Sequence, residues 1–324
     1  MARLVLALVF CFASAFFNYV DAAQLRTRGL SVWVQDMEQY AVDAGISLEV
    51  AREALGGFVP NERVIELDRR QPEGSVSFAA YKRNVITAAR IRKGASLMQR
   101  YEKELSLAER KTGVPPHIVV ALWGIESSFG QNTGGFNTIN SLATLAYEGR
   151  RASFFQSELI AAMRILERNR IAADALSGSW AGAMGQCQFM PSTYLKYAVD
   201  GDADGMADIW DNPADVIASI ANYLMAEGWD GNLTWGRAVN ARRVSVAEIG
   251  EMKSLEDWSN AGVVNTDGTH LPRRDLFATL IRVGGEDFLV YGNFDAIMRW
   301  NKSKYFALSV GILADRIRGY YEED

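Results

Sequence analysis

The sequence predicts a mainly helical protein of the α+β class, in which a small β lobe is inserted into a helical core. Helix-forming residues without proline fill the stretch from Ala79 to about Lys111, and helical patterns continue to about residue 227. Runs rich in β-branched and aromatic residues fall between Arg237 and Asn293. Apolar residues at helical spacing then return near the C-terminus. Apolar residues make up 49% and charged residues 23% of the 324 residues, as in ordinary globular proteins.

The first 22 residues have the features of an export signal. Residues 1–3 carry a positive charge, and the apolar run from Leu4 to Phe17 is shorter than the ~20 residues of a membrane-spanning helix. Small residues at Val20-Asp21-Ala22 suit a signal peptidase, so we expect cleavage after Ala22. The expected mature chain is periplasmic and does not span the membrane. It retains only Cys187, so it can form no internal disulfide.

Turn and cap residues set the expected order of elements. Two short helices are expected between Ser31 and Leu55, with Ser47 as the N-cap of the second and Gly56-Gly57 as its stop. The helical stretch from Ala79 ends at residues 112–116, where a break is followed by proline at a helix start.

A hairpin and a final helix are expected toward the C-terminus. Leu276–Val283 and Asp287–Tyr291 read as strands joined by Gly284-Gly285-Glu286. Four apolar residues at helical spacing then predict a last helix that packs back on the core: Phe306, Val310, Leu313 and Ile317. The chain is thus divided into segments 1–22, 23–236, 237–292 and 293–324.

Charge and histidine content exclude several classes of function. The formal net charge of -5 and the lack of a long Lys/Arg run argue against a nucleic-acid partner. Only His117 and His270 are present, which leaves little material for a serine or cysteine triad and no cluster with zinc-ligand spacing. Acid-base chemistry would therefore rest on carboxylates.

Glu126 is the candidate carboxylate. Ile118, Leu122, Ile125 and Phe129 follow one stripe of a helix that begins at Pro116, and Glu126 lies beside this stripe. Burial and the negative end of the helix dipole would both raise its pKa. A carboxyl group that is protonated near neutral pH can act as a general acid. The alternative is a surface glutamate near a helix end.

The segment from Ser179 to Ser192 combines small residues with amides. Small residues let a ligand approach the backbone, while Ser179 and Gln188 can hydrogen-bond to sugar substituents. The segment could form the floor of a groove, or it could be a tight glycine-rich connection between two packed helices.

Together these two segments resemble the lytic murein transglycosylase B family of peptidoglycan lytic transglycosylases. Gly124-Ile125-Glu126-Ser127 resembles the glutamate motif of the family, and residues 179–192 resemble its Ala-Met-Gly…Gln-Phe-Met-Pro-Ser segment. The resemblance covers residues 75–235 closely and residues 291–310 more loosely. It implies a lysozyme-like helical core with an N-terminal helical region, with Glu126 as the single catalytic acid and base.

The resemblance also implies residues that contact the substrate. These are Tyr81, Arg150, Arg151, Ser179, Gln188, Trp300, Asn301 and Tyr305. Trp300 departs from the tyrosine of the family and keeps an aromatic platform without its hydroxyl. A further family tyrosine corresponds to either Tyr305 or Phe306. The arginine pair could contact peptide carboxylates, or it could be a solvated helix entrance.

Residues 200–211 fit the spacing of an EF-hand loop. The expected ligands are Asp200, Asp202, Asp204, the Met206 carbonyl, Asp208 and Asp211, with Asp215 as an outer ligand like an aspartate in the resembling family. Asp211 is one methylene shorter than the usual glutamate. Alternatively, Asp215 is only the third residue of a helix begun by Asn212 and Pro213. We expect a structural Ca2+ ion, although a solvated loop without metal is the alternative, and we expect no organic cofactor.

The resemblance implies cleavage of the β-1,4 bond between N-acetylmuramic acid and N-acetylglucosamine in peptidoglycan glycan strands. Attack by the C6 hydroxyl of N-acetylmuramic acid would leave a 1,6-anhydro end without consuming water. A muramidase that uses water and a non-catalytic peptidoglycan-binding protein are the alternatives. We expect the protein to be a monomer.

Overall fold

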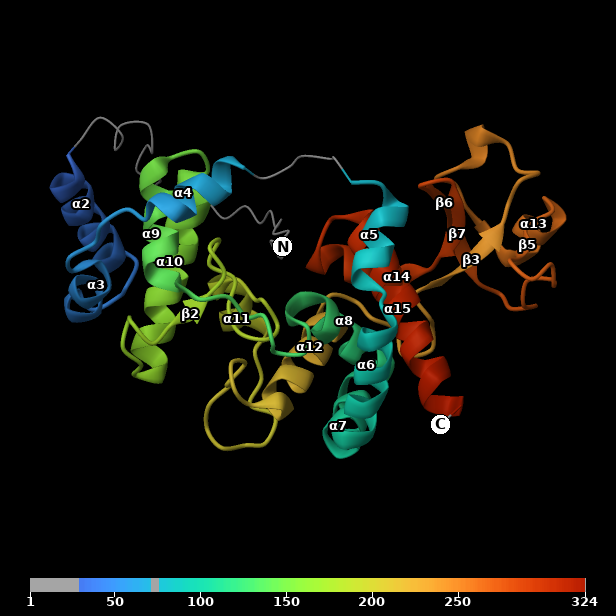
Figure 1. Cartoon of the computed structure of the whole chain (residues 1–324), viewed down its shortest axis with the longest axis horizontal. Helices are drawn as coiled ribbons and strands as arrows, with labels where there is room; N and C mark the ends of the chain where they lie inside the picture. The colour runs from blue at the N-terminus through green and yellow to red at the C-terminus, as the bar shows by residue number, and fades with distance from the viewer. Residues whose placement is uncertain (1–28, 71–75, 324) are drawn as a thin grey trace. The chain divides into compact units, whose positions relative to one another are not determined.

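The computed structural model describes residues 29–70 and 76–323 (Figure 1). Two compact units are present. Within the described residues, one combines 29–70 with Glu126–Ser219, and the other combines 76–125 with 220–323. The expected export signal at residues 1–22 lies outside the described residues, and the division at residues 236 and 292 stays a prediction.

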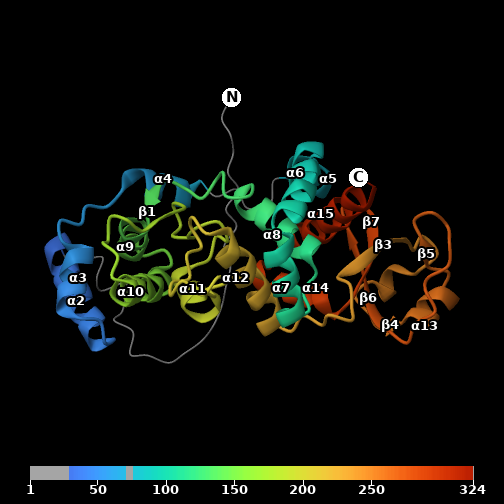
Figure 2. The same ribbon diagram turned by 90° about the horizontal axis from the view of Figure 1, so that it is seen from below.

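The first unit is built mainly from helices. They are α2 (Leu30–Asp43), α3 (Leu48–Leu55), α4 (Glu62–Arg69), α9 (Thr138–Glu148), α10 (Ala152–Asn169) and α11 (Pro191–Tyr197). The long helix α10 packs against α9, α11 and α3, and α9 and α10 lie side by side in Figures 1 and 2. Two short strands, β1 (Phe136–Asn137) and β2 (Ser177–Gly178), pair in antiparallel fashion.

The helix boundaries predicted near the N-terminus of this unit are confirmed. The Ser47 hydroxyl accepts a hydrogen bond from the Val50 amide at 3.4 Å and caps α3. After α3, Gly57 adopts a left-handed conformation with φ of 69°. A left-handed residue at this place costs glycine little, which explains why the glycine pair stops the helix.

The second unit begins with three helices where the sequence shows one helix-rich stretch. They are α5 (Phe78–Val85), α6 (Ala88–Arg100) and α7 (Glu102–Thr112). Ser77 and Thr87 accept hydrogen bonds from the amides of Ala80 and Arg90, so side-chain caps favour new helix starts at these points. Gly113, with φ of 73°, ends α7.

Two helices cross the boundary between the units along the chain. They are α8 (Pro116–Ser127) and α12 (Pro213–Ala226). Both begin at a proline, which suits the first helical position because its missing N–H group would have no partner there. This confirms the helix start predicted after the break at residues 112–116.

The β lobe of the second unit is one antiparallel sheet in the order β4-β6-β7-β3-β5. Its strands are β3 (Gly236–Asn240), β4 (Met252–Ser254), β5 (Val264–Asn265), β6 (Phe277–Val283) and β7 (Glu286–Val290). The predicted hairpin is β6–β7. Gly284 and Gly285 form its turn with φ of 59° and 81°, so the turn has two residues and Glu286 already belongs to β7.

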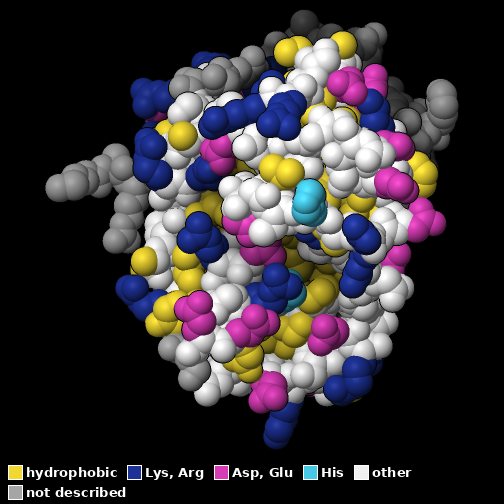
Figure 3. Space-filling view, turned by 90° about the vertical axis from the view of Figure 1, so that its right-hand side faces the viewer, with side chains coloured by type: hydrophobic (Ala, Val, Ile, Leu, Met, Phe, Trp, Pro, Cys, Tyr) yellow, Lys and Arg dark blue, Asp and Glu magenta, His cyan; other side chains and the backbone are white. Residues whose placement is uncertain are grey.

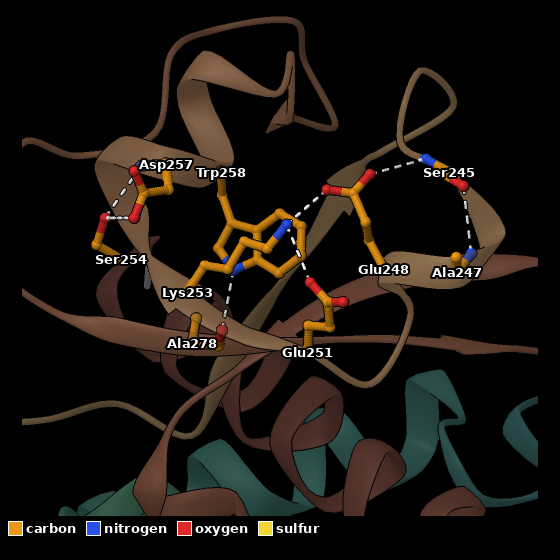
Figure 4. Close-up of polar contacts among 9 residues, drawn as sticks. All are labelled: Ser245, Ala247, Glu248, Glu251, Lys253, Ser254, Asp257, Trp258 and Ala278. Carbon is orange, nitrogen blue, oxygen red and sulfur yellow. Dashed lines mark hydrogen bonds and ion pairs between the residues drawn. The ribbon is translucent and has the colours of Figure 1, made fainter.

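One face of the lobe is closed by the helix α13 (Leu255–Asn260). Its Trp258 is fully buried and donates a hydrogen bond from Nε1 to the Ala278 carbonyl at 2.9 Å. Lys253 lies over the Trp258 ring and pairs with Glu248 at 2.5 Å and Glu251 at 3.0 Å (Figure 4). These contacts satisfy the charged groups of the edge strand β4 within the lobe.

The chain ends in α14 (Gly292–Trp300) and α15 (Lys304–Glu323). The four residues predicted to face the core, from Phe306 to Ile317, are all buried in α15. Helix α15 packs against α5, α6 and α14. Gly94 of α6 is required for this packing, because a β-carbon there would lie 2.6 Å from the Ile317 side chain. The predicted last helix is therefore confirmed.

The surface carries charges of both signs. On the face in Figure 3, basic and acidic side chains are interspersed, in keeping with the small net charge of -5. Across residues 29–70 and 76–323, the length and apolarity needed to cross a membrane are found in no helix.

Candidate active site

Glu126 lies in the last turn of α8 and is partly buried. The preceding residues of its helix, Ile118 and Leu122, are buried as the apolar stripe predicts. The stripe does not continue to Phe129, however, because the helix ends at Ser127. Ser128, Phe129 and Gly130 follow in left-handed conformations, with φ of 52°, 60° and 81°.

This run of left-handed residues turns the chain sharply behind Glu126. A non-glycine residue in this region costs roughly 1–2 kcal/mol, so surrounding contacts must hold the turn. The buried Ser127 hydroxyl accepts a hydrogen bond from the Gly130 amide at 2.9 Å, and the Ser127 carbonyl accepts one from Asn132 at 2.8 Å. The end of α8 is therefore fixed by local hydrogen bonds.

The glycine-rich segment packs closely against the chain that follows this turn and against α9. A β-carbon on Gly134 would overlap the Gly178 carbonyl, and one on Gly182 would overlap the Leu142 side chain. Both glycines have positive φ, of 97° and 86°. Close approach and backbone conformation together require glycine here. The segment is buried and tightly packed, as either predicted role would need.

Ser179 occupies a strongly buried position at the start of the segment, with 6% of its surface exposed. Its Oγ accepts a hydrogen bond from the Ala183 amide at 3.0 Å, and its own amide donates to the Ala183 carbonyl at 2.7 Å. The hydroxyl oxygen is used as an acceptor, which leaves the hydroxyl hydrogen for donation to another group.

Gln188 is partly buried and has a left-handed backbone, with φ of 51°. Its Nε2 donates to the carbonyl oxygens of Thr133 at 3.0 Å and Gly185 at 2.9 Å. These bonds use both amide hydrogens, so the side chain can offer a ligand only its Oε1 as an acceptor. Through Thr133, Gln188 also holds the chain that follows Glu126.

Cys187 lies buried within this segment. Its thiol is fully buried and lies 3.7 Å from the Val216 carbonyl. Burial raises the pKa of the Cys187 thiol well above its usual value, and the charges of Glu126 and Asp215 act in the same direction. The turn that follows Glu126 meets the same segment, because a β-carbon on Gly130 would overlap the Gln186 Oε1.

The acidic loop of residues 200–211 is organised by its own backbone amides. Asp200 accepts hydrogen bonds from Ala203 at 2.7 Å, Asp204 at 3.1 Å and Gly205 at 2.8 Å. These donors lower the pKa of Asp200, with the Gly205 amide the largest cause. Oxygen atoms of Asp200, Asp202 and Asp204 lie within 4.8 Å of one another.

This triad suits a hard cation. Carboxylate oxygens are the ligands that calcium prefers, and three of them at this distance repel one another unless positive charge is near. The structure brings together the first three predicted ligands. Asp208 instead accepts hydrogen bonds from the amides of Trp210 and Asp211 at 2.8 and 3.0 Å, and the Asp211 side chain is exposed. Met206 donates its amide to Asp204, which leaves its carbonyl as the predicted seventh-position group.

Asp215 is completely buried at the third position of α12. One carboxylate oxygen accepts from the Gly201 amide at 2.7 Å and the other from the Asp208 amide at 2.6 Å. Burial raises its pKa, while these two bonds oppose that shift. The carboxylate therefore joins the beginning of the acidic loop to its later part, a role beyond the two that were considered from the sequence.

Arg150 and Arg151 share one buried acidic partner in α4. Asp68 is 2% exposed and lies 3.3 Å from the Arg150 Nε and 3.1 Å from an amino group of Arg151. Arg151 also lies over the Phe155 ring at 4.9 Å. Half of the Arg150 side chain is exposed and could still meet a ligand. The pair is thus held by an ion pair rather than fully solvated.

Tyr81 and Tyr305 belong to the second unit and lie close together. Their ring centroids are 6.1 Å apart, and Tyr305 also packs against Phe78 at 5.2 Å. Phe306 is buried in the core with 3% of its surface exposed, whereas Tyr305 is partly exposed. Of the two alternatives, Tyr305 is the residue beside Tyr81.

Trp300 and Asn301 close α14 in the same unit. The Trp300 ring meets Tyr223 edge to face at 4.6 Å. Asn301 is 3% exposed, and its Oδ1 accepts a hydrogen bond from the Ser303 amide at 3.0 Å. This contact fixes the turn between α14 and α15.

Sequence reasoning missed two residues that organise the site. Gln186 bonds to the acidic loop, donating from Nε2 to the Trp210 carbonyl at 2.7 Å. Its only sequence signal was its place two residues before Gln188. Asp68 had no signal, because 83 residues separate it from Arg151.

Comparisons with known proteins identify the family. The sequence matches the model of the family described as "Transglycosylase SLT domain" over residues 29–315. It is also 31% identical over 263 residues to the membrane-bound lytic murein transglycosylase B of Escherichia coli (strain K12), which is 78% of this chain and 72% of that protein.

Solved structures agree in fold. SltB3 from Pseudomonas aeruginosa, in complex with NAG-anhNAM-pentapeptide, has a TM-score of 0.85 and 39% identity, covering 90% of this chain and 80% of that chain. The Escherichia coli lytic transglycosylase Slt35 in complex with calcium has a TM-score of 0.76 and 30% identity, covering 89% and 93%. The predicted mainly helical, lysozyme-like fold is confirmed. The chain therefore belongs to the transglycosylase SLT domain family.

Proposed function

We propose that the protein is a peptidoglycan lytic transglycosylase with Glu126 as its single acid and base. It cleaves the β-1,4 bond between N-acetylmuramic acid and N-acetylglucosamine and leaves a 1,6-anhydro end. The observation that carries this role is that Glu126 lies in the last turn of α8, and that Gly130, in the turn that follows, lies against the side chain of Gln186. This contact supports a site formed by Glu126 and the segment that holds Ser179 and Gln188.

The reaction balances with one carboxyl group. Protonated Glu126 donates its proton to the glycosidic oxygen as the bond from that oxygen to C1 of N-acetylmuramic acid breaks. The acetamido group of the substrate stabilises the cationic C1. The C6 hydroxyl oxygen then bonds to C1, and its proton passes to the Glu126 carboxylate, which restores the acid without a water molecule.

The polar groups of the glycine-rich segment suit sugar binding. The Ser179 hydroxyl can donate a hydrogen bond, and the Gln188 Oε1 can accept one. Tyr81, Tyr305, Trp300 and the Arg150 guanidinium remain candidates for other contacts with the glycan or its peptides. Such contacts are consistent with the peptidoglycan fragment present in the SltB3 complex.

The products that the protein releases from purified sacculi test the proposal. Wild-type protein should release muropeptides with anhydro ends, which mass spectrometry distinguishes from the reducing ends that a muramidase gives. Glu126→Gln should keep glycan binding and lose nearly all cleavage, since general acid-base catalysis contributes about 10²–10⁴-fold. Ser179→Ala is a useful companion, because it removes one donor and leaves the acid in place.

Three results would contradict the proposal. Reducing ends from the wild type would assign a hydrolase, and no release would assign a binding protein. Activity of Glu126→Gln within about threefold of the wild type would exclude Glu126, because an amide cannot act as the acid.

We further propose that Ca2+ binds the acidic loop and stabilises the fold. Asp200, Asp202 and Asp204 would hold it, supported by their clustered oxygens and by the calcium complex of Slt35. The ion would offset the repulsion among these carboxylates. Glu126 lies outside the loop, so the ion takes no part in the proton transfers.

Thermal unfolding with and without calcium tests this assignment. A ligand that binds only the folded protein raises the melting temperature by an amount set by its affinity. Asp204→Ala should abolish the rise, whereas the same change at the exposed Asp174 should preserve it. If calorimetry finds no binding at millimolar calcium, the loop is a solvated turn.

The site of action that we propose is the periplasm, with the protein acting as a monomer. The proposal for the compartment rests on the signal-like residues 1–22. N-terminal sequencing of the exported protein should begin near Ala23, and cell fractionation should recover it with periplasmic markers.

A further inference from the structure

Gln186 is attached to the acidic loop at two neighbouring points. Its amide donates to the Ile209 carbonyl at 2.8 Å, and its side-chain Nε2 donates to the Trp210 carbonyl at 2.7 Å. The preceding Gly185 packs against the same part of the loop, because a β-carbon there would lie 2.6 Å from the Ile209 carbonyl oxygen. These residues are therefore in register with positions ten and eleven of the loop.

The other end of the Gln186 amide faces the turn that follows Glu126. A β-carbon built on Gly130 would overlap the Gln186 Oε1, so the amide tip lies against this glycine. Gly130 in turn donates to the hydroxyl of the buried Ser127, the residue next to Glu126. Gln186 itself is 8% exposed. A continuous series of contacts thus joins the acidic loop to the end of α8, the helix that carries Glu126.

We propose that Gln186 is a positioning residue that fixes the left-handed turn behind Glu126 against the acidic loop. The inference rests on the proposed role of Glu126 as the acid. The turn contains two non-glycine residues in an unfavourable conformation, Ser128 and Phe129, so it needs support from outside. Glutamine suits this position because its Nε2 can donate a hydrogen bond to the Trp210 carbonyl while its small amide group lies against Gly130.

Gln186→Glu tests the proposal with almost no change in shape. An ionised carboxylate would face the Trp210 carbonyl without a hydrogen to donate, whereas a protonated one restores the donor. At neutral pH we expect kcat to fall about 10–100-fold with KM within twofold of the wild type, since small displacements of a catalytic group have effects of this size. The ratio of variant to wild-type kcat should rise as the pH is lowered.

Two further variants complete the design. Gln186→Met keeps the length and lacks the donor, so its kcat should be low at every pH, without recovery in acid. Gln35→Glu makes the same chemical change on an exposed face of α2 and should match the wild type. A kcat for Gln186→Glu within twofold of the wild type, or a deficit that does not respond to pH, would overturn the proposal.

Hydrogen exchange separates this proposal from the proposed function. The backbone amides of residues 127–134 should exchange at least threefold faster in Gln186→Met than in the wild type, whether or not the protein cleaves glycan. Unchanged exchange would refute the positioning role alone. If the wild type is inactive and exchange is still faster in Gln186→Met, the catalytic assignment of Glu126 is refuted and the positioning role of Gln186 is kept.

Discussion

Acidification should destabilise the fold partly through His117. This histidine lies in the first turn of α8 and is partly buried, with Arg318 of α15 nearby. Burial lowers its pKa from 6.5 to about 4, and the charge of Arg318 acts in the same direction. The folded protein therefore binds this proton less readily than the unfolded chain does.

The sign and size of the effect follow from these two pKa values. As the pH falls below 6.5, the unfolded chain takes up the proton first, so stability is lost progressively until the folded pKa near 4 is reached. Between pH 7 and pH 5 the loss attributable to His117 is about 2 kcal/mol. This is an upper limit, because solvent reaches part of the ring.

Urea unfolding at several pH values measures this contribution. His117→Gln removes the titrating group, so the free energy of unfolding of the variant should fall less than that of the wild type between pH 7 and pH 5, by up to about 2 kcal/mol. His270→Gln changes an exposed histidine and serves as the control. If His117→Gln and the wild type lose equal stability over this range, the reasoning is wrong.

Three more stability predictions concern the carboxylates of Glu158, Glu167 and Asp215. Burial raises the pKa of Glu158, so its contribution declines as the pH rises through the folded pKa, and Glu158→Gln should gain stability relative to the wild type between pH 4 and pH 7. A backbone hydrogen bond lowers the pKa of Glu167, so Glu167→Gln should lose stability relative to the wild type over the same pH range. Urea unfolding gives the slope of the unfolding free energy against pH, and equal slopes for the variants and the wild type would contradict both assignments. Asp215→Asn should cost about 3 kcal/mol in calcium-free buffer, because an amide can accept only one of its two backbone bonds, while the exposed Asp174→Asn should change stability by less than about 0.5 kcal/mol. Calorimetric scans of both variants check this, and equal melting temperatures would refute a stabilising role for the two hydrogen bonds that Asp215 accepts.

Local patterns predicted much of the fold. The Ser47 cap, the proline start of α8 and the β6–β7 hairpin each depend on neighbouring residues, and the structure confirms all three. The division of the stretch from Ala79 to Lys111 into three helices was not predicted. The first break depends on Thr87, whose capping role competes only weakly with a good helical pattern, and the second lies at Tyr101, which makes no side-chain cap.

Less of the site could be predicted from the sequence, because its residues contact partners that lie far away along the chain. The left-handed residues Ser128 and Phe129 have no local signal, since neither residue type favours this conformation. Helical periodicity therefore extended the apolar stripe past the true end of α8. Asp68 and Gln186 likewise gain their roles only from partners that the fold supplies.

The reactivity of the buried Cys187 thiol reports local opening of the protein. It is the only cysteine of residues 29–70 and 76–323, and its raised pKa keeps it in the form that does not attack disulfides. A thiol reagent can therefore react only when the segment around residue 187 opens. The labelling rate of the native protein then reports how often the segment of residues 179–192 opens locally, without any engineered probe.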